Sequence, residues 1–201
     1  MEGSSSSYVH VLTTLLILLA FTSYVSLASG AVAGKSSTEF IRKSCRVTIY
    51  PKLCFTSLSG YASAIQTSPK YLAYTALSVT LDAANYTSSV MKNLSRSHGM
   101  KPREVAAMGD CVELLSASVD QLRESLGEMN QIKEPNFEQM MSDIKTWVSA
   151  ALTDDDTCMD GFAEKAMDGN LKTVVRGRVL KIAQLTSNAL ALINTYASLH
   201  V

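Results

Sequence analysis

Histidine, glycine, proline and aromatic residues are all scarce in this sequence, and neither sign of charge dominates. Its 201 residues include 3 His, 10 Gly and 4 Pro, and only 7% are aromatic. This composition, with 47% hydrophobic and 18% charged residues, excludes a collagen-like or disordered chain and fits one globular domain. The 18 basic and 18 acidic residues leave no positive excess with which to hold nucleic acid, so no nucleic-acid partner is expected.

The first 28 residues are predicted to be a secretory signal peptide. An apolar run covers residues 9–21, and small residues follow it, with candidate cleavage sites between Ala28 and Ala33. The run is too short for an ordinary membrane span. An uncleaved anchor remains the alternative, because Glu2 precedes the run and no Lys or Arg does. We expect a secreted protein that is not held at a membrane once the signal is removed.

After this signal, apolar residues recur at steps of three and four, which is typical of amphipathic helices. Pro and Gly fall between four such stripes, at Pro69, Gly99, Pro102, Pro135 and Gly169. The predicted fold is all-α: an antiparallel four-helix bundle over residues 68–201, preceded by a helical hairpin over 36–65. A coiled coil is the alternative for such stripes. Their members are Leu72, Ala76, Val79, Ala83, Tyr86 and Val90; Val105, Met108, Val112, Leu115, Val119, Leu122, Leu126 and Met129; Phe137, Met141, Ile144, Val148, Ala151, Cys158 and Phe162; and Leu171, Val175, Ile182, Leu185, Ala189, Leu192, Tyr196 and Leu199.

The four cysteines are predicted to form two disulfides, because all of them follow the signal and would meet an oxidising compartment. Facing residues of an antiparallel hairpin lie symmetrically about its turn. Cys111 and Cys158 are symmetric about the predicted turn near Pro135, and Cys45 and Cys54 about Tyr50-Pro51. This symmetry favours Cys45–Cys54 and Cys111–Cys158 among the three possible pairings.

Catalytic and metal-binding patterns are weak in this sequence. His98 and His200 lie beside a helix end and the chain terminus, and no known nucleophile, zinc or phosphate-loop motif occurs. Asp154-Asp155-Asp156 fails the calcium-loop register and is interpreted as a solvated acidic turn. We therefore expect no catalytic residues, no metal and no other cofactor.

A polar ridge on the second predicted helix is the strongest candidate for function. Glu113, Ala117, Asp120 and Glu124 are spaced four, three and four residues apart, which places them on one face. The expected Cys111–Cys158 bond brings Thr157, Asp160 and Glu164 close to the same end. Such a face suits docking into a cleft on another protein, although a merely solvated helix surface shows the same pattern.

The whole mature chain resembles the plant invertase/pectin methylesterase inhibitor family. The matching segments are IRKSCRVTIYPKLC (41–54), GDCVELLSASVDQL (109–122), WVSAALTDDDTCMDGF (147–162) and SNALALIN (187–194). The resemblance implies a secreted four-helix bundle with first–second and third–fourth disulfides, as symmetry predicts. It also implies an enzyme inhibitor of the apoplast and cell wall, not an enzyme.

The resemblance leaves two targets open. The segment ending T-C-x-D-G-F is similar to pectin methylesterase inhibitors, which cover the esterase's substrate cleft with bundle helices. A one-to-one complex with the esterase is expected. Invertase inhibitors often carry Pro-Lys-Phe after the second helix, where this chain has Pro135-Asn136-Phe137. Pectin methylesterase is therefore favoured as the partner over acid invertase. A structural or signalling bundle without an enzyme target is a third possibility.

The family's contact residues match this chain at four positions. Carried over one by one, they are Glu113 and Asp120 on the second helix and Thr157 and Asp160 on the third. A further acidic contact of the family is Ala117 here, which affects affinity or the choice among esterase isoforms.

Two N-glycosylation sequons begin at Asn85 and Asn93. Tyr86 is expected in the core, and Asn93, seven residues later, shares its stripe. Asn85 is therefore the favoured candidate of the two.

Overall fold

The computed structural model describes residues 10, 13, 34–163 and 169–200. The predicted signal peptide, its cleavage region and Glu164 lie outside this set, apart from residues 10 and 13. Among the described residues, none of the helices combines the length and apolarity needed to cross a bilayer.

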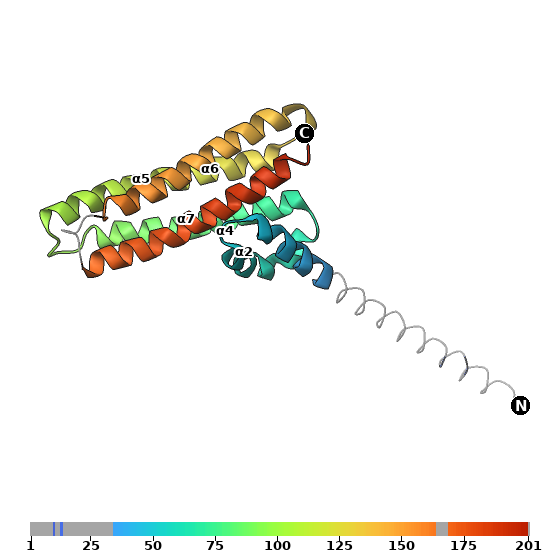
Figure 1. Cartoon of the computed structure of the whole chain (residues 1–201), viewed down its shortest axis with the longest axis horizontal. Helices are drawn as coiled ribbons and strands as arrows, with labels where there is room; N and C mark the ends of the chain where they lie inside the picture. The colour runs from blue at the N-terminus through green and yellow to red at the C-terminus, as the bar shows by residue number, and fades with distance from the viewer. Residues whose placement is uncertain (1–9, 11–12, 14–33, 164–168, 201) are drawn as a thin grey trace, which may run out of the picture.

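Four long helices run side by side and form an antiparallel bundle (Figure 1). They are α4 (Pro69–Leu94), α5 (Pro102–Gln131), α6 (Phe137–Asp160) and α7 (Asn170–Ala197). Each begins near a residue that the sequence marks as a helix start. Ser68, for example, caps α4 by accepting a hydrogen bond from the Tyr71 backbone N–H, and Pro69 occupies the first turn.

The connections between these helices are short, which forces sequential neighbours to be antiparallel. Gly99 lies between α4 and α5 with a φ of 90°, a backbone conformation that residues with a side chain rarely adopt. The 3-10 helix η3 (Glu134–Asn136) lies between α5 and α6. Its turn is closed by Asn136, whose Oδ1 accepts a hydrogen bond from the Lys133 backbone N–H at 2.7 Å.

Shorter helices precede the bundle and lie against α4 and α7 at one end of the molecule (Figure 1). Residues 34–44 are helical, and η1 (Cys45–Val47), α2 (Pro51–Leu58), η2 (Ser59–Tyr61) and α3 (Ala62–Ile65) follow. Disulfides join Cys45 to Cys54 and Cys111 to Cys158, the pairing that symmetry favoured. The second disulfide crosses from α5 to α6, with a Cα–Cα distance of 4.5 Å.

The apolar stripe of α6 is the best confirmed of the four. Its members from Phe137 to Phe162 are all buried. The prediction of the α4 stripe is partly wrong, because Tyr86 is 63% exposed. The face that α4 buries includes Thr80, Thr87 and Ser88, so a search for apolar residues places its centre incorrectly. Val105 and Leu199, near helix ends, are also exposed rather than buried.

Because α4 buries a different face from the predicted one, the two sequons must be compared again. Asn93 is exposed, whereas Asn85 is half-buried. The argument that favoured Asn85 placed Tyr86 in the core and is therefore wrong, and exposure favours Asn93.

The interpretation of Asp154-Asp155-Asp156 as a solvated turn is wrong. These residues continue α6, which ends at Asp160. Asp155 is fully buried, because it lies one turn after Ala151 and three residues before Cys158, on the stripe that faces the other helices. Of its two neighbours, Asp156 is exposed and Asp154 is half-buried.

Candidate binding surface

Acidic residues are concentrated on the two helices that carry the predicted site. α5 and α6 contain twelve acidic and three basic residues, whereas α4 and α7 contain one acidic and six basic residues. α5 packs most extensively on α6, and α4 on α7, so the charges are segregated between two sides of the bundle. A chain with no net charge thus presents one strongly acidic side.

The four predicted contact residues Glu113, Asp120, Thr157 and Asp160 are all exposed. The Thr157 hydroxyl donates a hydrogen bond of 2.7 Å to the Thr153 carbonyl, which fixes its side chain against α6. Asp120 forms an ion pair with Arg123, one turn further along α5. Ala117 is exposed as well.

These residues form a broad surface rather than one cluster. Asp120 follows Cys111 by nine residues, or two and a half turns, so it points away from α6. It also lies roughly 13 Å along α5 from the disulfide, given a rise of about 1.5 Å per residue. Glu113 points in nearly the same direction on α5 as Asp120, but Glu113 and Thr157 are within two residues of Cys111 and Cys158. The disulfide end is therefore the part of the surface where the two helices contribute together.

A second set of polar residues lies between the two helices, and sequence analysis did not identify it. We call Gln121, Glu128, Asp143 and Asp154 the α5–α6 seam. Gln121 lies four residues after Ala117, and Asp154 three residues before Thr157, so each shares a helix face with a predicted contact. The Gln121 side chain interacts with Asp154 across the two helices and lowers the pKa of its carboxyl.

The seam is electrostatically unusual. Burial raises the pKa of Glu128, and the carboxylates of Asp143 and Glu124 raise it further. Burial also raises the pKa of Asp154, partly offset by the interaction with the Gln121 side chain. Within the described part of the chain, three buried side-chain oxygens lack a hydrogen-bond partner, namely Gln121 Oε1, Glu128 Oε2 and Asp154 Oδ2. All three belong to the seam, which is therefore rich in unsatisfied acceptors.

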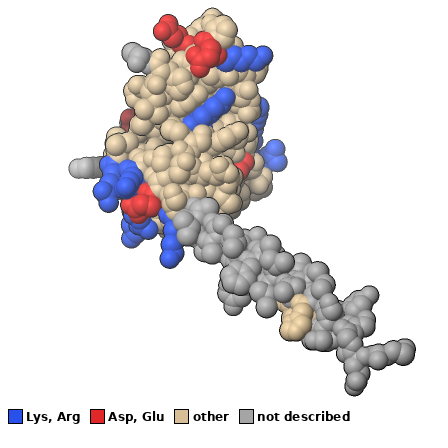
Figure 2. Space-filling model, turned by 90° about the vertical axis from the view of Figure 1, so that its right-hand side faces the viewer, with Lys and Arg blue, Asp and Glu red and all other residues tan. Residues whose placement is uncertain are grey.

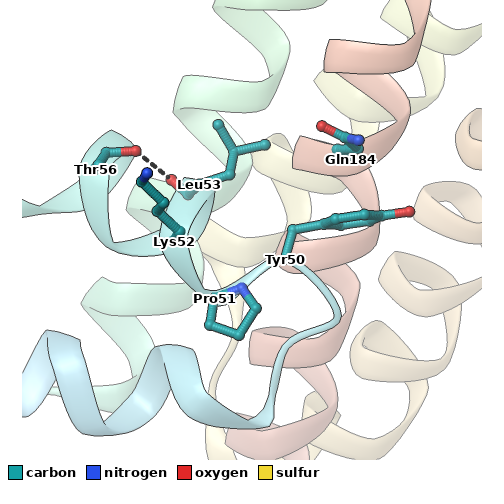
Figure 3. Close-up of a pocket in the computed structure, with 6 residues that line it drawn as sticks. All are labelled: Tyr50, Pro51, Lys52, Leu53, Thr56 and Gln184. Carbon is teal, nitrogen blue, oxygen red and sulfur yellow. Dashed lines mark hydrogen bonds between the residues drawn. The ribbon is translucent and has the colours of Figure 1, made fainter.

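A separate groove of about 400 Å³ lies where the N-terminal helices meet α7 (Figure 3). Asn188 of α7 holds this junction: its Oδ1 accepts a hydrogen bond from the Tyr50 N–H at 3.1 Å, and its Nδ2 donates to the Tyr50 carbonyl at 3.0 Å. The groove shares none of its lining with the α5–α6 surface. It is lined by Tyr50, Pro51, Lys52, Leu53, Thr56 and Gln184.

Figure 2 views the end of the molecule that carries the α5–α6 turn and the last turn of α7, where a broad uncharged surface separates charged side chains at the edges. Nowhere in the described residues do three His, Cys, Asp or Glu side chains come together as a metal site would require.

Phe137, Tyr196 and His200 pack ring against ring at the end of the molecule that carries the last turn of α7, with His200 stacked on Phe137 at 4.2 Å between centroids. His200 thus has a packing role here.

The fold and its charges define a disulfide-linked helical bundle with one acidic side. The family model described as plant invertase/pectin methylesterase inhibitor matches residues 39–192, and the chain belongs to this family of enzyme inhibitors, which are not enzymes themselves. Proteins named pectinesterase inhibitors are among the relatives that this chain matches.

Three relatives illustrate the match. The chain is 44% identical to a "21 kDa protein" of Daucus carota over 94% of this chain and 95% of that one. It is 43% identical to pectinesterase inhibitor 11 of Arabidopsis thaliana, over 92% and 95% of the two chains. Pectinesterase inhibitor 10 of the same plant is 46% identical over 85% of this chain and 55% of its own length.

The fold is also shared with a solved structure. A crystal structure of a mutant pectin methylesterase inhibitor from Arabidopsis aligns with a TM-score of 0.61, over 75% of this chain and 92% of the other. The sequences of this pair are only 23% identical.

Proposed function

We propose that this protein is a secreted inhibitor of pectin methylesterase, which it binds one to one so that α5 and α6 cover the substrate cleft. The identities of 43–46% to proteins named pectinesterase inhibitors carry this proposal. By reducing the esterase's access to pectin, the protein would regulate demethylesterification in the apoplast and cell wall. The predicted signal peptide at residues 1–28 supports that location.

The charge of the α5–α6 side indicates which chemical groups the covered surface of the enzyme would carry. The α5–α6 side presents exposed carboxylates, so a complementary partner supplies hydrogen-bond donors and positive charge. Polar groups that lose water at an interface cost free energy unless they are paired. Glu113, Asp120, Thr157 and Asp160 are the residues that we assign to this contact, with Thr157 closest to the disulfide that fixes both helices.

Invertase inhibition is the second candidate and has less support. The Pro135-Asn136-Phe137 segment, where invertase inhibitors often have lysine, has a structural role in this chain. Asn136 closes the turn, and Phe137 is buried against Tyr196. The segment therefore offers no cation for a target enzyme.

An inhibition assay separates these functions. The oxidised protein, without its signal peptide, is titrated into pectin methylesterase and separately into acid invertase at apoplastic pH. We expect the esterase to lose activity in proportion to added inhibitor, with an end point at one equivalent. Loss of invertase activity alone would assign the second function, and full activity of both enzymes across several isoforms would indicate a bundle without these targets.

A further inference from the structure

Asp155 is a fully buried carboxyl at the junction of three helices. It belongs to α6, and its oxygens meet one hydroxyl from each neighbouring helix. Ser118 of α5 donates to Oδ1 at 3.0 Å, and Thr186 Oγ1 of α7 lies 3.2 Å from Oδ2. Both hydroxyl-bearing residues are fully buried as well. The proposed contact surface does not use this cluster.

Counting protons at Thr186 shows which form of Asp155 fits the cluster. The Thr186 hydroxyl is within hydrogen-bond distance of two acceptors, Asp155 Oδ2 and the Ile182 carbonyl, the latter at 3.0 Å. A hydroxyl has one proton to donate, so an ionised Asp155 leaves one of these contacts unfilled. A proton on Oδ2 resolves the conflict: Asp155 donates to Thr186, and Thr186 donates to Ile182.

The surrounding charges favour the same form. The groups that face Asp155 from α5 and α7 are the neutral hydroxyls of Ser118 and Thr186. The charges that act on it are the carboxylates of Asp154 and Asp156, on its own helix, and both are negative. Burial chiefly, with these two carboxylates, raises its pKa to about 7, although the two hydroxyls oppose the shift.

We propose that Asp155 is held as an un-ionised carboxylic acid that joins α5, α6 and α7 in acidic surroundings, and that its ionisation loosens this junction as the pH rises. This pH-dependent junction is a property of the fold and does not depend on which enzyme the protein inhibits. It acts close to the candidate surface, because Asp155 precedes Thr157 by two residues and Cys158 by three.

The direction of the pH effect follows from proton binding. An aspartate in an unfolded chain has a pKa of about 3.9, so between that value and about 7 the folded protein retains a proton that the unfolded chain loses. The stabilisation from Asp155 is complete below the unfolded pKa and is lost as the pH rises through about 7. Within this window the unfolding constant grows about tenfold per pH unit from this one group.

Urea unfolding of the disulfide-intact protein between about pH 4.5 and 8.5 tests the proposal. Asp155→Asn keeps the shape of the side chain, accepts from Ser118 and donates to Thr186, but does not titrate. Near pH 5.5, each pH unit should raise the equilibrium constant for unfolding about tenfold more in wild type than in Asp155→Asn. Asp156→Asn, an exposed neighbour, should retain the wild-type slope. Equal slopes for wild type and Asp155→Asn would overturn the proposal.

A direct titration does not depend on any variant folding. Carbon NMR of the labelled wild-type protein follows the Asp155 carboxyl signal with pH, assigned through its coupling to the backbone. We expect a midpoint near 7 in the folded protein. A midpoint near the ordinary aspartate value, with the protein still folded, would show that the carboxyl is ionised in the native state and the proposal is wrong.

Discussion

Thr157 is the residue at which the candidate surface is tested most sharply. Its hydroxyl is already bonded to the Thr153 carbonyl, and its side chain is exposed, so it contributes little to the core. Replacing it with Trp places a large ring where a partner would have to approach. We expect Thr157→Trp to weaken inhibition by on the order of a hundredfold, about 2.7 kcal/mol, in a titration against pectin methylesterase.

The matched control for this change is Thr195→Trp. Thr195 is an exposed threonine of α7 with the same type of hydrogen bond, 2.9 Å to the Ala191 carbonyl. It should inhibit as wild type does, and both variants should keep the helical circular dichroism and thermal midpoint of the parent. Undiminished inhibition by a folded Thr157→Trp protein would place the contact surface elsewhere.

Charge reversal at Asp120 tests the outer edge of the same surface. The side chain is exposed and paired only with Arg123 on its own helix, and such surface pairs contribute about 0.2–1 kcal/mol to stability. Asp120→Lys should therefore fold normally but weaken binding on the order of tenfold, mainly through a slower association rate. Association kinetics at low and high salt measure this.

Asp82→Lys provides the comparison, since Asp82 is an exposed aspartate of α4, on the other side of the bundle. If both reversals weaken binding equally, the effect comes from net charge and Asp120 is not a contact.

At the scale of single elements, the Cys111–Cys158 bond joins α5 to α6. The bond closes a loop with a sequence separation of 47, and the chain-entropy relation gives about 4 kcal/mol for such a loop. The Cys111→Ala/Cys158→Ala double variant should lose about that much unfolding free energy. It should also bind the esterase more weakly, because the end of the surface near Thr157 is no longer fixed.

The Cys45→Ala/Cys54→Ala variant separates the two effects. Its loop has a separation of only 9, for which the same relation gives about 2.5 kcal/mol, and it lies in the N-terminal helices. Urea unfolding and inhibition assays of both variants should show the smaller loss of stability here and no loss of binding. Weaker inhibition by this variant would mean that the N-terminal helices contribute to the contact.

The elements also show what could be predicted from the sequence and what could not. Helix positions and the disulfide pairing follow from periodicity and symmetry, because each depends on spacing along the chain. The buried face of α4 does not, since Thr80 donates its hydroxyl to the Ala76 carbonyl and so occupies a core position without being apolar. Asp155 was missed for the same reason, because it is a polar residue at a core position. Its spacing from Ala151 and Cys158 did place it on the buried stripe.

The seam between α5 and α6 was unpredictable in a different way. Gln121 and Asp154 each look like ordinary surface residues on their own helix. Only the packing of the two helices brings them together and buries their oxygens. A contact between residues 33 positions apart leaves no local pattern in the sequence.

At the scale of the whole molecule, Asn188 of α7 joins the N-terminal helices to the bundle through two hydrogen bonds. Asn188 is 3% exposed, and its amide pairs with both the N–H and the carbonyl of Tyr50. The sequence marks this position only as part of the SNALALIN segment. α2 and η1 also pack on α7, and apolar residues of all three belong to the core. Because apolar contacts have no direction, the paired hydrogen bonds of Asn188 specify where the turn at Tyr50-Pro51 docks.

Asn188→Leu preserves the volume of the side chain and removes both hydrogen bonds. The Tyr50 N–H and carbonyl then lose their partners in a half-buried site, which we expect to cost about 3 kcal/mol and to lower the thermal midpoint by about 6–12 °C. Asn194→Leu, an exposed change on the same helix, should leave the midpoint within about 2 °C. Proteolysis should cut the first variant faster within residues 34–65, whereas the bundle fragment retains inhibition. An unchanged midpoint for Asn188→Leu would show that apolar packing alone positions the N-terminal helices.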